Sequence, residues 1–586
     1  MDLRDIESLP NWLEKRYSIL WKAFKGKEFE RSQAVDLLKE RSGDDERSVT
    51  SILSELRRAG WLEMKIHQED ARKSIYTLKA RAGIREILSK NTLTRRDIEA
   101  LLKRAADLIR TRVDYKFILI LLFLKRISDK WELEFEEAYK EAYEDGLSDE
   151  EAKEEAKNSV WHTFNLPEEY LWENIRKDVA NLPERLSKAL KKIAELNPEL
   201  KDVIDNVDFI QFASNRENLE ILRQLIELFS ERKLHHVSPD ILGDSYEWIL
   251  RYFAPDKAKE GEVYTPREVI KLLVEMLDPK PKQEVYDPAC GSGGMLILSY
   301  KHIEEIYGKE EAKKLFLYGQ EANQTTYALC RMNLYIHDMM DYQLAMGDTL
   351  LFPKFKESDG LKQFDVVIAN PPWNQDGYDE NVLKRGDFWR ARYRYGFTPK
   401  QSADWTWIQH MVASAKDNGK VGIVIDNGCL FRGGKERAIR ARALDDDLVE
   451  CVILLPEKLF YNTGAPGTVM IFNKNKLEKR KVLFINASSE YEQHPEVRKL
   501  NQLGDKNIEK MASAYNKFKE IEGFSRVVPL KEIKENDYNL NVTLYVFPEE
   551  EMEAIDVNRE WNEVRKIEED IAKVEEKIEN FLKEVK

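Results

Sequence analysis

The residues best suited to chemistry in this sequence are Asn370, Pro371, Pro372 and Trp373, which follow the hydrophobic run 364–369. Two consecutive prolines cannot continue a strand, so they predict a rigid, extended lip on which the Asn370 side chain and the Pro371 carbonyl face one way. The exocyclic amino group of adenine is a poor nucleophile because its lone pair is delocalised into the ring. Two hydrogen bonds accepted from it, by Asn370 Oδ1 and the Pro371 carbonyl, would localise the lone pair for attack on a methyl group. Trp373 would stack on the extruded base, whereas a plain strand-ending turn explains one proline but not the set.

A glycine-rich loop is the second candidate. Residues 287–294, Asp-Pro-Ala-Cys-Gly-Ser-Gly-Gly, lie between a predicted strand and a helix that starts near Met295. Glycines let the backbone approach a ligand closely, and the free N–H groups of a helix N-terminus favour a polar or anionic group. A single glycine-rich turn is weak evidence, because many such turns are only tight connections.

Two acidic residues strengthen the case for a ligand. Glu321 ends the next predicted strand, where its carboxylate can accept hydrogen bonds from ribose hydroxyls, although a helix N-cap is the alternative. Asp348 follows another short strand and would meet the adenine edge of a cofactor. With the glycine-rich loop, these positions predict a nucleotide-like cofactor.

The elements that must position these residues begin near residue 246, where short apolar runs alternate with helical patterns. Such alternation is typical of a doubly wound, Rossmann-like α/β fold with a parallel sheet. The predicted strands are Glu284–Tyr286, Phe316–Gly319, Val366–Ala369, Val421–Ile425, Val452–Leu455, Val469–Phe472 and Val482–Ile485. We therefore predict one α/β catalytic domain over 246–548.

The first 90 residues predict a separate small module. The last helical pattern has one apolar face, formed by Ile52, Leu53 and Leu56, and Gly60 is a suitable C-terminal cap. Two strand-like runs follow, at 61–66 and 74–78. This order resembles a winged helix. Arg57 and Arg58 would then contact DNA phosphates; the alternative is a docking domain with a solvated helix.

The remaining segments are helical in pattern. Residues 91–245 predict an all-α domain with a buried helix at 117–124 and a solvated helix pair in the charged block 132–157. Residues 549–586 predict a charged helix with an apolar heptad stripe made of Val564, Ile567, Ile571, Val574, Ile578, Phe581 and Val585. A partner helix would cover the stripe, and packing onto its own chain is the alternative.

Composition limits the function classes. The 586 residues suffice for about four domains of ~150 residues. Hydrophobic residues at 42% and charged residues at 34% indicate a folded, soluble chain, and no apolar run approaches the ~20 residues of a membrane span. No signal peptide is evident at the start, so we expect a cytoplasmic protein. The net charge of −14 disfavours the whole surface as a nucleic-acid platform, so local patches or a partner must attract DNA.

Two stretches near the lip interleave basic and aromatic residues. They are Phe388–Tyr395 and Arg432–Arg437. This composition suits contact with phosphates and an opened duplex, whereas a solvated loop or an intramolecular set of salt bridges is the alternative.

The order of these motifs resembles the amino-methyltransferases that use S-adenosylmethionine. More narrowly, the chain resembles the modification subunit of type I restriction-modification systems over roughly 93–548. Further matching stretches are Asp107–Arg110, Phe123–Asp129, Gly261–Pro266, Leu459–Gly464 and Asn536–Asn541. The winged-helix-like segment lies outside the usual core of that family.

The resemblance implies a cofactor, a target and partners. S-adenosylmethionine would be held by Gly261, Glu262, Val263, Tyr264, Thr265, Pro266, Asp287, Ala289, Gly291, Ser292, Gly293, Gly294, Glu321 and Asp348. Residues Asn370 to Trp373 would hold a flipped adenine whose N6 is methylated, with no metal and no covalent intermediate. The partners would be double-stranded DNA, a specificity subunit bound through the C-terminal helix and a restriction (nuclease and translocase) subunit, with two copies of this chain per complex.

Three rival functions stay open at this point. An N4-cytosine methyltransferase and a protein glutamine methyltransferase share the Asn-Pro-Pro lip. A winged-helix DNA-binding scaffold with a degenerate methyltransferase domain is the third. Methylation of cytosine carbon-5 is disfavoured, because it needs covalent attack and no Pro-Cys nucleophile accompanies the lip.

Overall fold

The computed structural model describes residues 11–547 apart from 26, 43, 59–60, 67–73, 80–94, 110–113, 206, 235–236, 238, 258–264, 359, 461–462 and 496, together with 561, 565–567, 571, 573 and 574. The chain divides into two compact units, residues 1–256 with 324–340 and residues 257–323 with 341–586. The first unit holds two separate hydrophobic cores, and the second unit is built around a core of its own.

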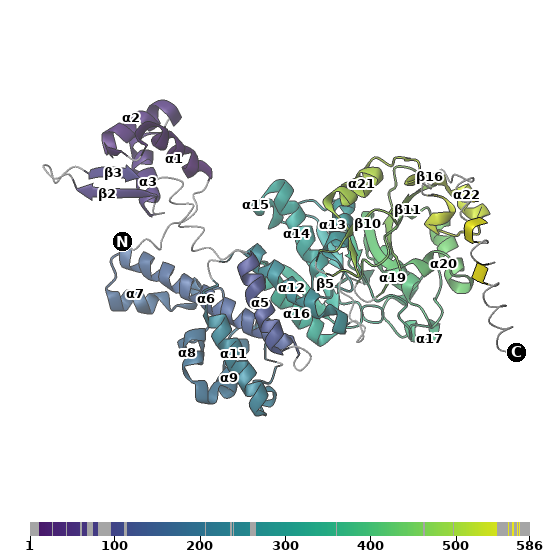
Figure 1. Ribbon diagram of the computed structural model, residues 1–586, viewed down its shortest axis with the longest axis horizontal. Helices are drawn as coiled ribbons and strands as arrows, with labels where there is room; N and C mark the ends of the chain where they lie inside the picture. The colour runs from purple at the N-terminus through teal and green to yellow at the C-terminus, as the bar shows by residue number, and fades with distance from the viewer. Residues whose placement is uncertain are drawn as a thin grey trace. The chain divides into compact units, whose positions relative to one another are not determined.

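The start of the chain forms a three-helix module on a small antiparallel sheet of order β1-β3-β2 (Figure 1). Its elements are α1 (Asn11–Phe24), β1 (Glu28–Glu30), α2 (Arg31–Ser42), α3 (Glu46–Arg58), β2 (Leu62–Ile66) and β3 (Ser74–Leu78). Ile52, Leu53 and Leu56 of α3 are buried in the module core, as their shared face predicted. The order of elements is that of a winged helix, which confirms the prediction. The predicted cap Gly60 lies outside the described residues.

The other described residues of the first unit form helices and the loops between them. This part contains α5 (Arg95–Ile109), α6 (Lys116–Glu144), α7 (Asp149–Ala156), α8 (Trp172–Lys177), α9 (Leu182–Leu196), α10 (Phe209–Phe212), α11 (Arg216–Ser230), α12 (Pro239–Lys257) and α16 (Gln324–Ile336). The run 117–124 is buried along its whole length, as predicted. The charged block forms a helix pair, in which the Tyr139 hydroxyl on α6 donates to Asp149 on α7 at 2.7 Å. No described helix is long and apolar enough to cross a membrane.

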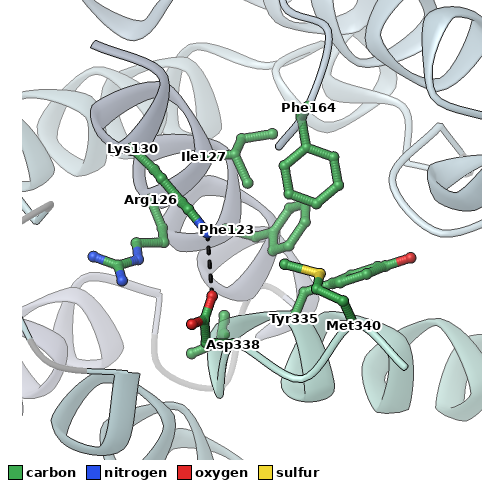
Figure 2. A pocket seen from close by; sticks show the side chains of 9 residues that line it. Phe123, Arg126, Ile127, Lys130, Phe164, Tyr335, Asp338 and Met340 are labelled. Atoms are coloured by element: carbon green, nitrogen blue, oxygen red, sulfur yellow. Dashed lines mark hydrogen bonds and ion pairs between the residues drawn. The ribbon is translucent and has the colours of Figure 1, made fainter. Parts of the chain in front are cut away.

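A small pocket lies within this unit between α6 and α16. Figure 2 shows Phe123, Phe164 and Tyr335 on its apolar side, while Lys130 Nζ donates to Asp338 Oδ1 at 3.1 Å. Its lining therefore combines aromatic and aliphatic side chains with one ion pair and the side chain of Arg126.

The second unit is organised by a nine-stranded sheet of order β16-β13-β11-β12-β10-β9-β4-β5-β6. The strands are β4 (Glu284–Asp287), β5 (Phe316–Glu321), β6 (Tyr342–Met346), β9 (Phe364–Ala369), β10 (Ala415–Asp426), β11 (Val449–Leu454), β12 (Gly467–Asn473), β13 (Lys481–Asn486) and β16 (Ser525–Pro529). All seven strands predicted by range are present, β6 is the short strand predicted before Asp348, and β16 is additional. The run β6-β5-β4-β9-β10 is parallel, whereas β12 and β16 are antiparallel to their neighbours, so the sheet is mixed rather than wholly parallel.

Helices cover both faces of this sheet (Figure 1). The helices of the second unit are α13 (Arg267–Leu277), α14 (Gly294–Tyr307), α15 (Lys309–Ala312), α17 (Glu380–Leu383), α18 (Trp389–Arg392), α19 (Asp404–Ala413), α20 (Gly434–Asp445), α21 (Asp505–Asn516) and α22 (Leu530–Glu535). On β10, Gly422 faces Leu277 of α13, while its neighbours Val421 and Ile423 pack in one core with α19. Successive strand residues point to opposite faces, so α13 and α19 lie on opposite sides of the sheet.

Candidate active site

Apart from the segment 261–266 before α13, the predicted site loops follow the carboxyl ends of parallel strands. The strand order reverses between β4 and β9, since β5 and β6 lie on one side and β10 on the other. Open α/β sheets bind ligands in the crevice at such a switch point. The ends of β4, β5, β6 and β9 and the loops after them carry the other predicted site residues.

The glycine-rich loop leaves β4 and enters α14 with the backbone that its glycines allow. Gly291 and Gly293 have positive φ, 53° and 86°. Gly293 is the N-terminal cap of α14, and a Cβ on Gly294 would lie 2.9 Å from Ile270 Cδ1 of α13. The Gly293 N–H donates to the Cys290 carbonyl at 2.8 Å, so Gly294 is the residue that places a backbone N–H at the helix N-terminus without a side chain in the way, as an anionic or polar ligand requires.

Glu321 ties the ends of two neighbouring strands together. Its carboxylate accepts hydrogen bonds from the Gly291 N–H at 3.1 Å and the Asn323 N–H at 2.8 Å. The bond from Asn323 resembles the helix N-cap that was the alternative for this residue. The bond from Gly291 places the carboxylate at the glycine-rich loop. Burial raises the pKa of Glu321, although these backbone donors oppose the shift.

Asp287 is the buried carboxyl of the loop. It is 1% exposed, and its Oδ1 accepts from the Ala289 N–H at 3.0 Å. Burial, with a contribution from Glu321, raises the pKa of Asp287 to about 8. Its carboxyl is therefore neutral over much of the ordinary pH range.

Asp348 is held by neighbours on both of its oxygens. Oδ1 accepts from the Leu351 N–H at 3.1 Å, and Oδ2 accepts from the Tyr378 hydroxyl at 2.9 Å. Burial, reinforced by Asp348, raises the pKa of Tyr378. The adjacent Thr349 hydroxyl donates to the Pro288 carbonyl at 2.7 Å, which fixes this loop against the glycine-rich loop.

The lip after β9 carries Asn370 between two partners. Asn370 Nδ2 donates to Thr265 Oγ1 at 2.8 Å, and Trp373 Nε1 donates to Asn370 Oδ1 at 2.8 Å. Thr265 directly precedes Pro266, the residue before α13. The structure thus brings together Thr265 and Asn370, which are 105 residues apart. Gly261, Glu262, Val263 and Tyr264 lie outside the described residues.

Phe460 is a site residue that we did not single out from the sequence. Its ring meets Trp373 edge-on, with centroids 4.8 Å apart and planes at 68°. A Cβ on Gly467 of β12 would lie 2.6 Å from Phe460 Cε2 and 3.0 Å from Trp373 Cη2. The only sequence signal was the membership of Phe460 in the 459–464 stretch that supports the family resemblance.

Most described arginines of the two basic stretches already have intramolecular partners. Arg392 is 1% exposed and donates to backbone carbonyls, including that of Thr349. Arg394 pairs with Asp446, Arg432 with Asp404 and Arg437 with Asp537. For these four arginines the structure favours the salt-bridge alternative over phosphate contact.

Two family models match the chain. One, described as N-6 DNA Methylase, covers residues 237–554, and the other, described as HsdM N-terminal domain, covers 98–229. The chain belongs to the N-6 DNA methylases. It is a DNA methyltransferase, the methylase subunit of a type I restriction-modification system.

The relatives of this methylase subunit are similar over nearly its whole length. The type I restriction enzyme MjaVII and MjaVIII methylase subunits of Methanocaldococcus jannaschii are each 45% identical to it, over 97% and 100% of this chain and 96% and 99% of their own. A solved type I methyltransferase subunit from Streptococcus thermophilus aligns with a TM-score of 0.68 and 27% identity, over 78% of this chain and 100% of its own. Neither family model reaches the winged-helix module, yet the two Methanocaldococcus alignments extend into it.

Proposed function

We propose that this methylase subunit transfers a methyl group from S-adenosylmethionine to N6 of an adenine flipped out of duplex DNA. The observation that supports this most directly is the position of Asn370. It lies at the carboxyl end of β9, next to the switch point, with its amide tied to Thr265. An acceptor held in one orientation beside a nucleotide-type crevice suits recognition of an exocyclic amino group.

The proposed cofactor site consists of Gly261 to Pro266, Asp287, Ala289, Gly291 to Gly294, Glu321 and Asp348. Gly294 offers its N–H at the N-terminus of α14, and Glu321 offers carboxylate oxygens at the end of β5. These donors and acceptors fit an amino acid head and a ribose. When bound there, S-adenosylmethionine supplies a methyl group that is electrophilic because it is attached to a sulfonium sulfur.

The proposed base site consists of Asn370, Pro371, Pro372 and Trp373. Asn370 Oδ1 and the Pro371 carbonyl accept the two hydrogen bonds of the adenine amino group, which keeps the nitrogen lone pair out of the ring and directed at the methyl carbon. Trp373 releases Asn370 Oδ1 and stacks on the base. The reaction needs no metal or covalent enzyme intermediate.

The proposed partners are double-stranded DNA, a specificity subunit, a restriction subunit and a second copy of this chain. We assign the specificity subunit to the C-terminal helix. Of its predicted apolar stripe, the three described residues Ile567, Ile571 and Val574 are 60%, 52% and 54% exposed. An apolar stripe this exposed suits a partner helix, which would cover it as in a coiled coil. We propose that this multisubunit complex acts on DNA in the cytoplasm.

The test is transfer of radiolabelled methyl from S-adenosylmethionine to unmethylated duplex DNA, followed by nucleoside analysis. The purified chain is compared with the chain co-expressed with its neighbouring subunits. We expect N6-methyladenine, and only with the specificity subunit present. Label on N4 of cytosine or in protein would replace the proposed substrate, and cofactor binding without any label would favour the scaffold alternative.

A further inference from the structure

The residue that directly follows the lip is held at both its backbone and its side chain. Asn374 has left-handed backbone geometry, with φ 52°. Its N–H donates to Asp404 Oδ1 at 2.9 Å, and its side-chain Oδ1 accepts a hydrogen bond from Arg432 Nη2. Asparagine tolerates this backbone region better than most residues do. The chain after Trp373 therefore leaves the lip in one fixed direction.

Arg432 links this residue to three carboxylates. Its Nη1 donates to Asp404 Oδ2 at 2.8 Å and lies 3.4 Å from Glu436 Oε1, and its Nη2 donates to Asp426. The side chains of Asp404 and Glu436 are 0% and 1% exposed, whereas that of Arg432 is 29% exposed. Arg432 is thus the cation that compensates two buried carboxyl groups behind the lip.

The surrounding chain is shaped to admit the guanidinium. A Cβ on Gly428 would lie 2.5 Å from Arg432 Nη2 and 2.6 Å from Asp426 Oδ2. The Gly428 N–H donates to the same Asp426 oxygen at 2.9 Å. Glycine at this position therefore keeps open the space in which Arg432 reaches Asn374.

The charges of the cluster agree with this geometry. Burial raises the pKa of Asp404 and of Glu436, and Arg432 opposes both shifts. Burial also disfavours the charged guanidinium, but its carboxylate partners outweigh that effect and raise the pKa of Arg432. The cation therefore stays charged at every working pH, which a permanent anchor requires.

We propose that Arg432 is a positioning residue for methyl transfer. Through Asn374 and Asp404 it sets where the lip ends, and so where Asn370 Oδ1 and the Pro371 carbonyl stand relative to the methyl group. The role rests on the proposed function, because it matters only if the lip holds the reacting group. Arg432 acts on the geometry of the acceptors and not on the cofactor site, so its loss lowers turnover and spares cofactor affinity.

Three variants test the role by different routes. Asn374→Gly keeps a left-handed backbone accessible and removes only the acceptor for Arg432. Gly428→Ala pushes the guanidinium aside without changing any charge. Arg432→Lys keeps the charge and loses the two-armed donor. Arg437→Lys is the matched control, because Arg437 lies nearby but pairs with the exposed Asp537.

The measurement is the single-turnover rate of methyl transfer by the complex with its specificity subunit, together with cofactor affinity by calorimetry and the melting temperature. We expect each test variant to slow transfer about tenfold with cofactor affinity unchanged, because small misplacements of reacting groups are costly. The melting temperature should stay unchanged in Asn374→Gly, which leaves the ion pairs intact, and fall in Gly428→Ala and Arg432→Lys, which disturb the compensation of Asp404 and Glu436. Arg437→Lys should behave as wild type. Wild-type rates in Asn374→Gly and Gly428→Ala, or loss of cofactor affinity in step with rate, would overturn the role. Label from the wild type on cytosine or protein would overturn only the proposed substrate, because the rates of the variants would then be measured on that product. No label at all would overturn the proposed function and the role of Arg432 together.

Discussion

Thr265 Oγ1 lies 2.8 Å from Asn370 Nδ2, which joins the segment before α13 to the lip after β9. Because Thr265 takes the amide nitrogen, the other end of the Asn370 side chain is its acceptor oxygen. That oxygen accepts the indole N–H of Trp373 at 2.8 Å. The Trp373 indole N–H can only donate, so it fixes Oδ1 as the end of the Asn370 amide at the proposed base site, and the Thr265 hydroxyl holds the opposite end.

Replacing Thr265 tests this orientation directly. Thr265→Val removes the hydroxyl and keeps the shape, so we expect kcat for methyl transfer to fall about five- to tenfold, as expected for loss of one hydrogen bond worth about 1 kcal/mol. Thr265→Ser should retain most of the rate because it keeps the acceptor. Steady-state kinetics with saturating cofactor would decide: an unchanged kcat with weakened cofactor binding would assign Thr265 to the cofactor alone.

Trp373 competes with the base for Asn370 Oδ1. Trp373→Phe keeps a ring for stacking and removes the N–H that occupies the oxygen. We expect the affinity for DNA with adenine at the target position to rise about fivefold, from about 1 kcal/mol of relieved competition. Fluorescence anisotropy of an end-labelled duplex measures this, and weaker binding by the Phe variant would mean that the indole itself contributes to the base contact.

Gly467 makes room for the aromatic pair at the lip. A Cβ there would lie 2.6 Å from Phe460 Cε2, so Gly467→Ala should displace the ring and with it Trp373. We expect methyl transfer to fall more than tenfold while cofactor binding is retained, because the cofactor residues lie on other strands. Gly464→Ala, where an added Cβ meets nothing within 4 Å, is the control. Equal rates for both variants would contradict a role for this packing.

Asp287 should make stability depend on pH. Its pKa is about 8 in the fold against an ordinary value of 3.8, so the folded protein holds a proton that the unfolded chain loses above pH 4. The free energy of unfolding should therefore fall as pH rises from about 4 to about 8, by at most about 1.4 kcal/mol per pH unit, and level off above. Asp287→Asn should remove this slope in urea denaturation at several pH values. The control is Asp417→Asn, at an exposed aspartate, which should leave the slope intact. If the slope persists in Asp287→Asn, the pH dependence belongs to other titratable groups.

The sequence predicted those strands whose side chains are buried on both faces, because such strands are continuous apolar runs. β11, β12 and most of β9 are of this kind. β6 was predicted only as a short strand before Asp348, without bounds, because it is an edge strand in which no residue is fully buried, so polar and apolar residues mix along it. Hydrophobic pattern carries no information about strand direction, and the antiparallel placement of β12 emerged only from the structure.

The candidate site was predictable where local backbone chemistry defines it and not where packing does. Asn370 to Trp373 and the glycine-rich loop stand out because consecutive prolines and glycines restrict or free the backbone. The bonds from Asn370 to Thr265 and from Asn374 to Arg432 join residues 105 and 58 positions apart. No periodicity or spacing encodes such contacts. The basic stretch at Arg432 therefore suggested phosphate contact from its sequence, whereas the arginine binds Asn374 and Asp404 beside the lip.

The winged-helix module should contact DNA through α3. Its described outward residues Thr50, Ser54 and Arg57 are polar or basic. Residues 11–79 hold 15 Lys and Arg against 12 Asp and Glu in a chain that is acidic overall. Arg57→Ala should weaken duplex binding by the full complex and lower the slope of log affinity against log salt by about 0.9, the loss of one phosphate contact. Lys22→Ala removes the same charge from exposed α1 and should leave the slope unchanged. Binding titrations at several salt concentrations measure both variants. If both variants lower the slope equally, net charge alone explains the binding. If neither variant changes it, the docking-domain alternative is favoured.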